Sequence, residues 1–449
     1  MKKIGLAIAV FVLIFVIYYM TLGSKQITKE IKQEVNKELV ELKQSGFGIK
    51  EQNLSENKQH IVIIFNDTNK ITQYLNKQSK EKVKSSDIEV LKGMEIGMDI
   101  AYMPSAKYAV AMDIYPLKLP NSFYQVSMKE DDKAIVKKLE EIIKERLFVT
   151  HININKLLSH FDGYVKDIDK EFIDNGKKVH LISKGLKFEG DIKNEKIESI
   201  SHKLEILSIQ VPNELDINIS GLTSNIESDD NIYDNISYNI KSINMDSKVE
   251  QPFSLSIKNI EGSSKDKINN NLISSTSRLK ITSIDLNESG KESKLETINI
   301  SSAINNINKK ALEKLEQITS QDDNSSIEQI VPIFKEIAKE DISIDIPDIS
   351  VGKITNEGNT FNGFKIKALA KLDKNFDWKK VDSDPLELVN IIDAKINIEA
   401  SDELIDTLSN NPQAMIMMMV IQPIDKNGTK YYNIEFKNGS LKINGKPFM

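Results

Sequence analysis

Leu215-Asp216-Ile217-Asn218-Ile219-Ser220 alternates apolar and polar residues one by one, and the same alternation returns many times in the middle of the chain. Further runs of this kind are Val179/Leu181, Leu204/Ile206, Ile236/Tyr238/Ile240, Phe253/Leu255/Ile257 and Leu279/Ile281. Clusters of Asn, Asp, Ser and Gly separate the runs. A period of two with polar turns is typical of antiparallel strands that bury one face. The sequence therefore predicts a β-rich meander over residues 178–303.

Mixed patterns flank this meander. Residues 24–177 alternate strand-like runs with helical ones, including an apolar stripe at Ile27, Ile31, Val35, Leu39 and Leu42. The stripe predicts an amphipathic helix that packs on its own domain, with a stalk or a coiled-coil homodimer contact as the alternative. Residues 304–449 predict an α+β region. We expect an α+β fold in which a long, curved antiparallel sheet carries helices packed on one face.

The C-terminal region has three local signals. Residues 304–319 and 326–340 have helical spacing, and Ser401 is placed to cap a further helix. The chain then closes with two short alternating runs around Asn438-Gly439, which is a strong hairpin signal.

The N-terminus carries the longest apolar run. After Lys2-Lys3, residues 4–21 contain no charged side chain. Residues 1–23 therefore predict an uncleaved transmembrane anchor, since about 20 apolar residues cross a bilayer. A cleaved signal peptide is the alternative, but the exit from the run offers a poor cleavage site. The two lysines favour a cytoplasmic N-terminus. We expect a single-pass inner-membrane protein that contacts membrane lipid through this helix, with its bulk in the periplasm.

Composition excludes several functional classes. The chain of 449 residues has no Cys, so disulfides, thiolate catalysis and Cys-ligated metals are excluded. The net charge is −6, and Arg146 and Arg278 are the only arginines. No basic patch is interleaved with aromatic residues, so we expect no nucleic-acid partner.

Motifs for catalysis or cofactor binding are missing. The histidines His60, His151, His160, His180 and His202 fit no zinc-enzyme spacing. Asp167 begins a calcium-loop-like run, but Phe172 and Lys178 occupy the places that need Gly and Glu. Ser277-Arg278-Leu279-Lys280 fits a Ser-x-x-Lys pattern but lies on a strand-like run and lacks the partner motif. We predict no enzyme activity, no catalytic residue, no metal and no cofactor.

One apolar segment is unusual. Residues 414–421 read Ala-Met-Ile-Met-Met-Met-Val-Ile, which is too short to span a bilayer. Methionine-rich faces accommodate varied apolar ligands. The functional hypothesis is an apolar groove lined by Met415, Met417, Met418 and Met419. The alternative is a buried helix or strand end.

The general plan resembles the YdgA-like family of bacterial inner-membrane proteins of unknown function. The basic N-terminus with one anchor, the Ser/Asn-rich β region and the ending at residues 432–446 carry the resemblance. The family's His-Gly-Pro segment has no counterpart, since the nearest match, Tyr115-Pro116-Leu117, lacks the histidine. The resemblance implies a periplasmic body on an inner-membrane anchor and supplies no reaction.

These observations favour a non-catalytic cell-envelope protein that binds a partner protein or acts as a scaffold. The alternative function is binding or transfer of a lipid or another apolar ligand in a groove of the sheet.

Overall fold

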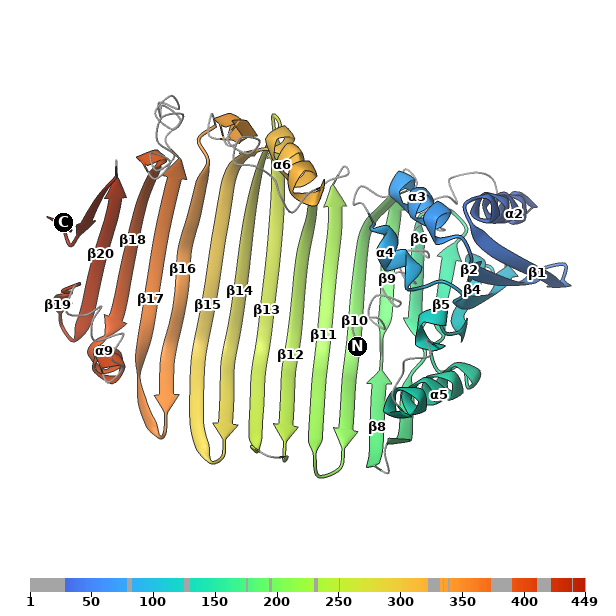
Figure 1. Ribbon diagram of the computed structural model, residues 1–449, viewed down its shortest axis with the longest axis horizontal. Coiled ribbons are helices and arrows are strands. Elements are labelled where there is room, and N and C mark those ends of the chain that lie inside the picture. The colour runs from blue at the N-terminus through green and yellow to red at the C-terminus, as the bar shows by residue number, and fades with distance from the viewer. Residues whose placement is uncertain are drawn as a thin grey trace. The chain divides into compact units, whose positions relative to one another are not determined.

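The computed structural model describes residues 29–78, 83–124, 130–174, 177–193, 196–229, 233–249, 251–321, 332–333, 335–337, 340–372, 390–409, 421–437 and 439–448. The chain divides into two compact units, Met1–Ser228 and Asp229–Met449. Antiparallel strands dominate both units (Figure 1).

Within its described residues, the first unit combines eleven strands with short helices. Its helical elements are α2 (Lys29–Gln44), α3 (Thr68–Gln78), α4 (Ser85–Glu89), η1 (Asn121–Tyr124) and α5 (Glu130–Lys144). Its strands are β1 (Phe47–Ser55), β2 (Lys58–Phe65), β3 (Glu95–Tyr102), β4 (Tyr108–Lys118), β5 (Thr150–Asn155), β6 (His160–Val165), β7 (Ile168–Asp174), β8 (Lys177–Lys184), β9 (Lys187–Lys193), β10 (Lys196–Val211) and β11 (Leu215–Asp229).

These strands form one antiparallel sheet. Strands β1 to β6 pair in chain order, and β6 pairs with β9. The long strand β10 pairs with β9 along its first half, with β8 along its second half, and with β11 on its other side. Strand β7 pairs with β8, so the β7–β8 hairpin continues the line of β6 and β9.

Helices α2, α3 and α4 bury the apolar face of β2 to β5. Val35, Leu39 and Leu42 of α2 are buried in this core, together with Ile61 of β2 and Met112 of β4. The predicted packing of the 27–42 stripe on its own domain is therefore confirmed for the described part of that helix.

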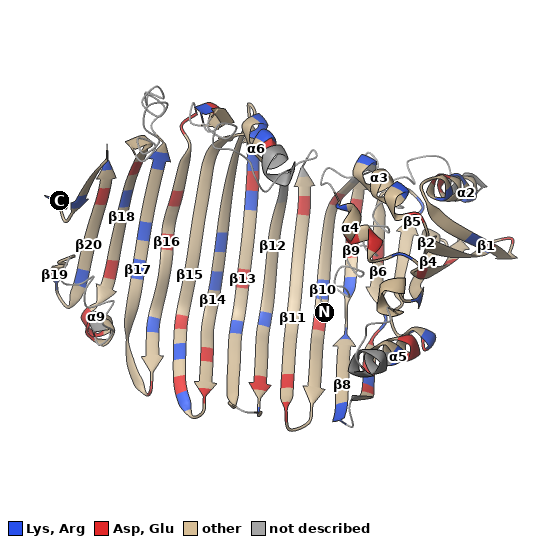
Figure 2. Ribbon diagram, viewed as in Figure 1, with Lys and Arg blue, Asp and Glu red and all other residues tan. Residues whose placement is uncertain are grey.

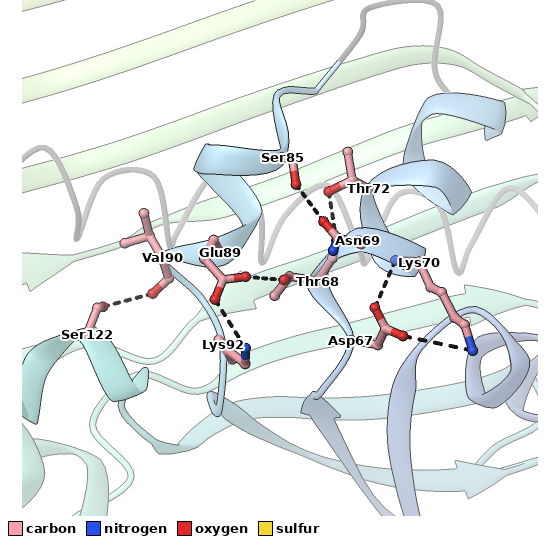
Figure 3. Close-up of polar contacts among 10 residues, drawn as sticks. All are labelled: Asp67, Thr68, Asn69, Lys70, Thr72, Ser85, Glu89, Val90, Lys92 and Ser122. Carbon is pink, nitrogen blue, oxygen red and sulfur yellow. Dashed lines mark hydrogen bonds and ion pairs between the residues drawn. The ribbon is translucent and has the colours of Figure 1, made fainter.

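Polar contacts fix the ends of α3 and α4 (Figure 3). The Asp67 carboxylate accepts a hydrogen bond from the Lys70 backbone N–H at 3.1 Å, which satisfies a free donor in the first turn of α3. The Thr68 hydroxyl donates to Glu89 at the end of α4. Lys92 lies 3.2 Å from the same carboxylate. These bonds hold α3 and α4 together over the core.

Helix α5 lies on the opposite face of this sheet. It contacts β4 and β7. Arg146, two residues past its end, stacks over the ring of Tyr115 at 4.1 Å. Since Met112 and Ile114 of the same strand belong to the α2–α4 core, the alternation of side chains places Tyr115 on the other face.

The second unit is built mainly from long strands. The strands are β12 (Tyr233–Ser247), β13 (Phe253–Asn269), β14 (Leu272–Glu288), β15 (Lys291–Asn308), β16 (Ser343–Asn356), β17 (Asn359–Leu372), β18 (Ile392–Ser401), β19 (Ile424–Lys426), β20 (Thr429–Lys437), β21 (Ser440–Ile443) and β22 (Lys446–Pro447). Its described helices include α6 (Lys309–Gln321) and α9 (Asp402–Ser409).

Neighbouring strands from β12 to β18 pair antiparallel in chain order, and β20 then pairs with β18, β19 and β21. Figure 1 shows the long strands side by side, with α6 and α9 near strand ends. The alternating runs predicted for residues 233–303 do form antiparallel strands that pair in chain order, and this pairing continues beyond residue 303. Strand β15 runs to Asn308 because Ile304 pairs with Ile344, and α6 begins only afterwards. The other expected helix, 326–340, lies largely outside the described residues.

Two local predictions near the C-terminus are confirmed. The Ser401 hydroxyl accepts a hydrogen bond from the Leu404 N–H at 3.2 Å at the start of α9. Strands β20 and β21 form the expected terminal hairpin, in which Gly439 has a φ of +70°.

The predicted fold class is wrong. The protein is mostly antiparallel sheet, not an α+β fold with helices packed on one face: α2–α4 and α5 lie on opposite faces of the first sheet. Within the described ranges, no helix is long and apolar enough to cross a bilayer. This finding contradicts the expected N-terminal transmembrane helix and the single-pass inner-membrane location inferred from it. Residues 4–21, on which both rested, lie outside the described ranges.

Candidate apolar binding face

The register of the second unit aligns apolar side chains into rows that cross the sheet. Directly opposed residues on neighbouring strands point to the same side of a sheet. The first row consists of Ile243, Ile257, Ile284, Leu295, Ile354 and Phe361. The second consists of Ile240, Ile260, Ile281, Ile298, Val351, Phe364 and Ala400. The third consists of Tyr238, Gly262, Leu279, Ile300, Ile349, Ile366, Ile398 and Tyr432. We call these three rows the apolar face.

A line of unpaired residues separates the first row from the second. We call this line the crease. Its residues have no partner in the pairing of neighbouring strands; they are Lys241, Asn259, Thr282, Thr297, Gly352 and Gly363. Asn259 and Thr297 have φ values of +49° and +57°. Left-handed residues of this kind are typical of β-bulges, which turn the following side chain to another face. On every one of these strands the apolar residues that flank the crease are three positions apart. The crease therefore keeps both rows on one face.

Two residues of the apolar face are exposed to solvent, whereas Ile260, Ile298, Ala400 and Tyr432 of the same rows are buried. Ile300 is 40% exposed and Tyr238 39% exposed, although both lie in the middle of long strands. Ile344, on the same side of β16 near its start, is 49% exposed. Helices α6 and α9 contact β15, β17, β18 and β20. With strands about 4.8 Å apart, a row across eight strands is roughly 35 Å long. Exposed apolar surface that is rimmed by polar residues is typical of interaction sites.

The other face of this sheet is polar, and many of its charges are paired. Lys395 lies 3.1 Å from Glu435, and Lys437 lies 3.3 Å from Asp393. Asp285 lies within 3.8 Å of both Lys258 and Lys294. Figure 2 shows Lys, Asp and Glu interspersed along the strands, without a large region of one sign. This face gives no sign of recognising a polyanion.

Histidines of the first unit lie beside carboxylates on adjacent strands. The ring nitrogens of His60, His151, His160 and His180 lie 2.6–2.9 Å from Asp99, Asp113, Asp191 and Asp169, respectively. The bond from His160, and a weaker one from the Ser199 hydroxyl, lower the pKa of Asp191. The neighbouring Lys184, followed by His180, lowers the pKa of Asp169.

The side chains around His160 are not arranged as a Ser-His-Asp triad. Ser199 donates to the Asp191 carboxylate, not to the His160 ring, so the order of hydroxyl, imidazole and carboxylate is absent there. His202 accepts or donates a bond with Ser224 at 3.2 Å, and burial lowers the pKa of this histidine. Among the described residues, no group of His, Asp and Glu side chains could hold a metal ion.

The predicted methionine groove lies elsewhere in the chain. Met415, Met417, Met418 and Met419 fall outside the described residues. Sequence reasoning found the alternating runs that supply the apolar face but did not place the rows next to one another. The signal in the sequence that could have placed them was the spacing of three residues between the apolar side chains on either side of each crease position.

No protein-family model, curated protein or solved structure matches the chain. The resemblance to the YdgA-like family therefore stays a prediction, and the function has to be argued from the geometry.

Proposed function

We propose that this protein is a non-catalytic binding protein that holds an elongated apolar molecule, such as the acyl chain of a lipid, along the apolar face. The observation that carries the proposal is the alignment of apolar rows across up to eight strands, with Tyr238 and Ile300 exposed to solvent in the third row. An apolar ligand would bury this surface, and each Å² of apolar surface removed from water contributes about 25 cal/mol to the free energy of binding.

The shape of the face favours a long ligand over a compact one. The rows run across the strands without interruption by a charged side chain between Tyr238 and Ile398. In the third row Gly262 lies between Tyr238 and Leu279, and the Tyr238 ring packs over it. A flexible acyl chain adapts to such a surface, because its methylene groups contribute about 0.8 kcal/mol each when buried.

The test is titration of the purified full-length chain with a dansyl-labelled fatty acid, followed by competition with the unlabelled acid. We expect saturable fluorescence enhancement. We expect Ile300→Asp to weaken binding at least tenfold, because the new carboxylate would be buried against the acyl chain of the ligand without a hydrogen-bonding partner.

Thr276→Asp is the matched control. It introduces the same side chain on the neighbouring strand β14. Ser277 lies two positions from Leu279 of the apolar face and points to the same side as Leu279, so Thr276 points to the polar side. This variant should bind as the parent does. Far-ultraviolet circular dichroism of both variants verifies folding. Absence of saturable binding by the folded parent chain, or equal losses in both variants, would contradict the proposal.

A further inference from the structure

A small polar cavity lies at the C-terminal end of the second unit. It has a volume of about 240 Å³, and its lining includes side chains of β17, β18, β19 and β20. Cavities for drug-sized ligands span about 300–1,000 Å³, so a smaller molecule fits this one.

Two transverse rows of the polar face form its floor. Lys367, Asn397 and Asn433 lie directly opposite one another on β17, β18 and β20. Glu399 and Tyr431 form the next row, and Ile424 of β19 lies opposite Tyr431. The lining also includes Ile398 and Tyr432, but the polar side chains of these two rows alternate with them along β18 and β20 and therefore point away from the apolar face.

Three polar side chains on this floor are not paired with any other described side chain. Within the described part of the chain, Lys367, Asn397 and Glu399 make no side-chain hydrogen bond or ion pair, although they face a common cavity. Elsewhere on the polar face, lysines and carboxylates of neighbouring strands pair with each other. Asn397 and Glu399 are half-buried and Lys367 is exposed, so their donors and acceptors are open to water or to a ligand.

The rim adds order and an aromatic surface. The Asn444 side chain accepts a hydrogen bond from the Asn433 N–H at 2.8 Å and donates to the Gln422 carbonyl at 2.6 Å. These bonds tie the turn after β21 to the segment before β19. The ammonium of Lys426 lies 5.9 Å from the centre of the Tyr431 ring.

We propose that this cavity binds a small polyhydroxylated molecule of monosaccharide size. An amide, an ammonium and a carboxylate on adjacent strands offer alternating donors and acceptors, which match the vicinal hydroxyl groups of a sugar ring. The Tyr431 ring offers a flat surface for the apolar face of the same sugar. This site is independent of the proposed function, because it uses the opposite side of the sheet.

The experiment is saturation-transfer difference NMR of the full-length chain with glucose, galactose and N-acetylglucosamine, with glycine and glutamate as zwitterionic comparisons. We expect at least one sugar to give a signal that titrates to saturation. Lys367→Ala and Asn397→Ala should each weaken its binding about tenfold, since each removes a hydrogen-bonding partner of the ligand.

Lys371→Ala is the matched control. Lys371 lies on β17 four residues from Lys367, on the same face, and does not line the cavity. It should leave sugar binding unchanged. The proposal is overturned if no sugar binds, if only the amino acids bind, or if the Lys371 variant weakens binding as much as the Lys367 variant.

Discussion

Asp99 and Asp113 lie directly opposite each other on β3 and β4, so two carboxylates occupy one cross-strand pair. Like charges in this position destabilise a sheet. Each carboxylate has a histidine on its outer side, His60 at 2.6 Å and His151 at 2.7 Å. A row of His, Asp, Asp and His thus crosses four strands of the first unit.

Asp99 has more partners than Asp113, and this difference leads to the first prediction. The Tyr115 hydroxyl donates to Asp99 at 2.8 Å, and Arg146 lies 3.5 Å from the same oxygen. Asp99→Asn should lower the free energy of unfolding by about 1–2 kcal/mol, because hydrogen bonds to a charged group are weakened.

Asp113→Asn should cost less than about 1 kcal/mol, since the lost bond to His151 is partly offset by relief of the repulsion from Asp99. Urea denaturation of both variants measures the difference. A larger loss for Asp113→Asn than for Asp99→Asn would show that the two carboxylates do not have these roles.

A second prediction concerns pH. Burial lowers the pKa of His202 below its ordinary value of 6.5. The unfolded chain therefore binds a proton at a pH where the folded state resists it. The contribution of this residue to stability is complete above about pH 6.5 and is lost as the pH falls through the folded pKa.

Urea denaturation at about pH 7.5 and about pH 5.5 measures this loss. We expect His202→Gln to reduce the loss of stability between the two pH values, because glutamine does not titrate. Equal losses in the parent and the variant would assign the pH dependence to other groups. The pKa values of the Asp169 and Asp191 carboxyl groups are lowered in the folded protein. Their contribution to the free energy of unfolding is therefore lost only at lower pH, as the pH falls through these lowered values.

A third prediction tests the crease. A methyl group added at Gly363 would overlap the carbonyl oxygen of Val351 on the adjacent strand. Gly363→Ala should therefore destabilise the protein by about 1–3 kcal/mol, the usual cost of overpacking.

Gly358→Asn in the adjacent β16–β17 turn is the comparison. Gly358 has a φ of +85° and no atom within 4 Å of an added Cβ, and asparagine tolerates left-handed backbone better than most residues. Thermal denaturation should place its midpoint closer to the parent than that of Gly363→Ala. The reverse order would mean that β16 and β17 do not approach closely at Gly363.

Local sequence signals predicted much of the fold. Period-two alternation identified the meander, Ser401 marked the start of α9, and Gly439 marked the final turn. Each signal depends on residues only a few positions apart. The end of β15 was predicted wrongly, because pairing with a strand some forty residues later overrode a helical pattern that begins at Ile304.

The candidate sites were less accessible from the sequence. The apolar face depends on the register of up to eight strands. The cavity places Lys367 in one cross-strand row with Asn433, which is 66 positions away along the chain. The predicted methionine groove relied on composition within one short segment and lies outside the described residues.

The amino-acid sequence by itself determined that strands form here and that each has one apolar side, because side-chain direction follows the chain with a period of two. Only the tertiary structure decided which residues became neighbours across the sheet. The bond between His60 and Asp99 and the shared face of Ile257 and Ile260 depend on strand register and on a left-handed Asn259, and both are set by pairing between distant segments.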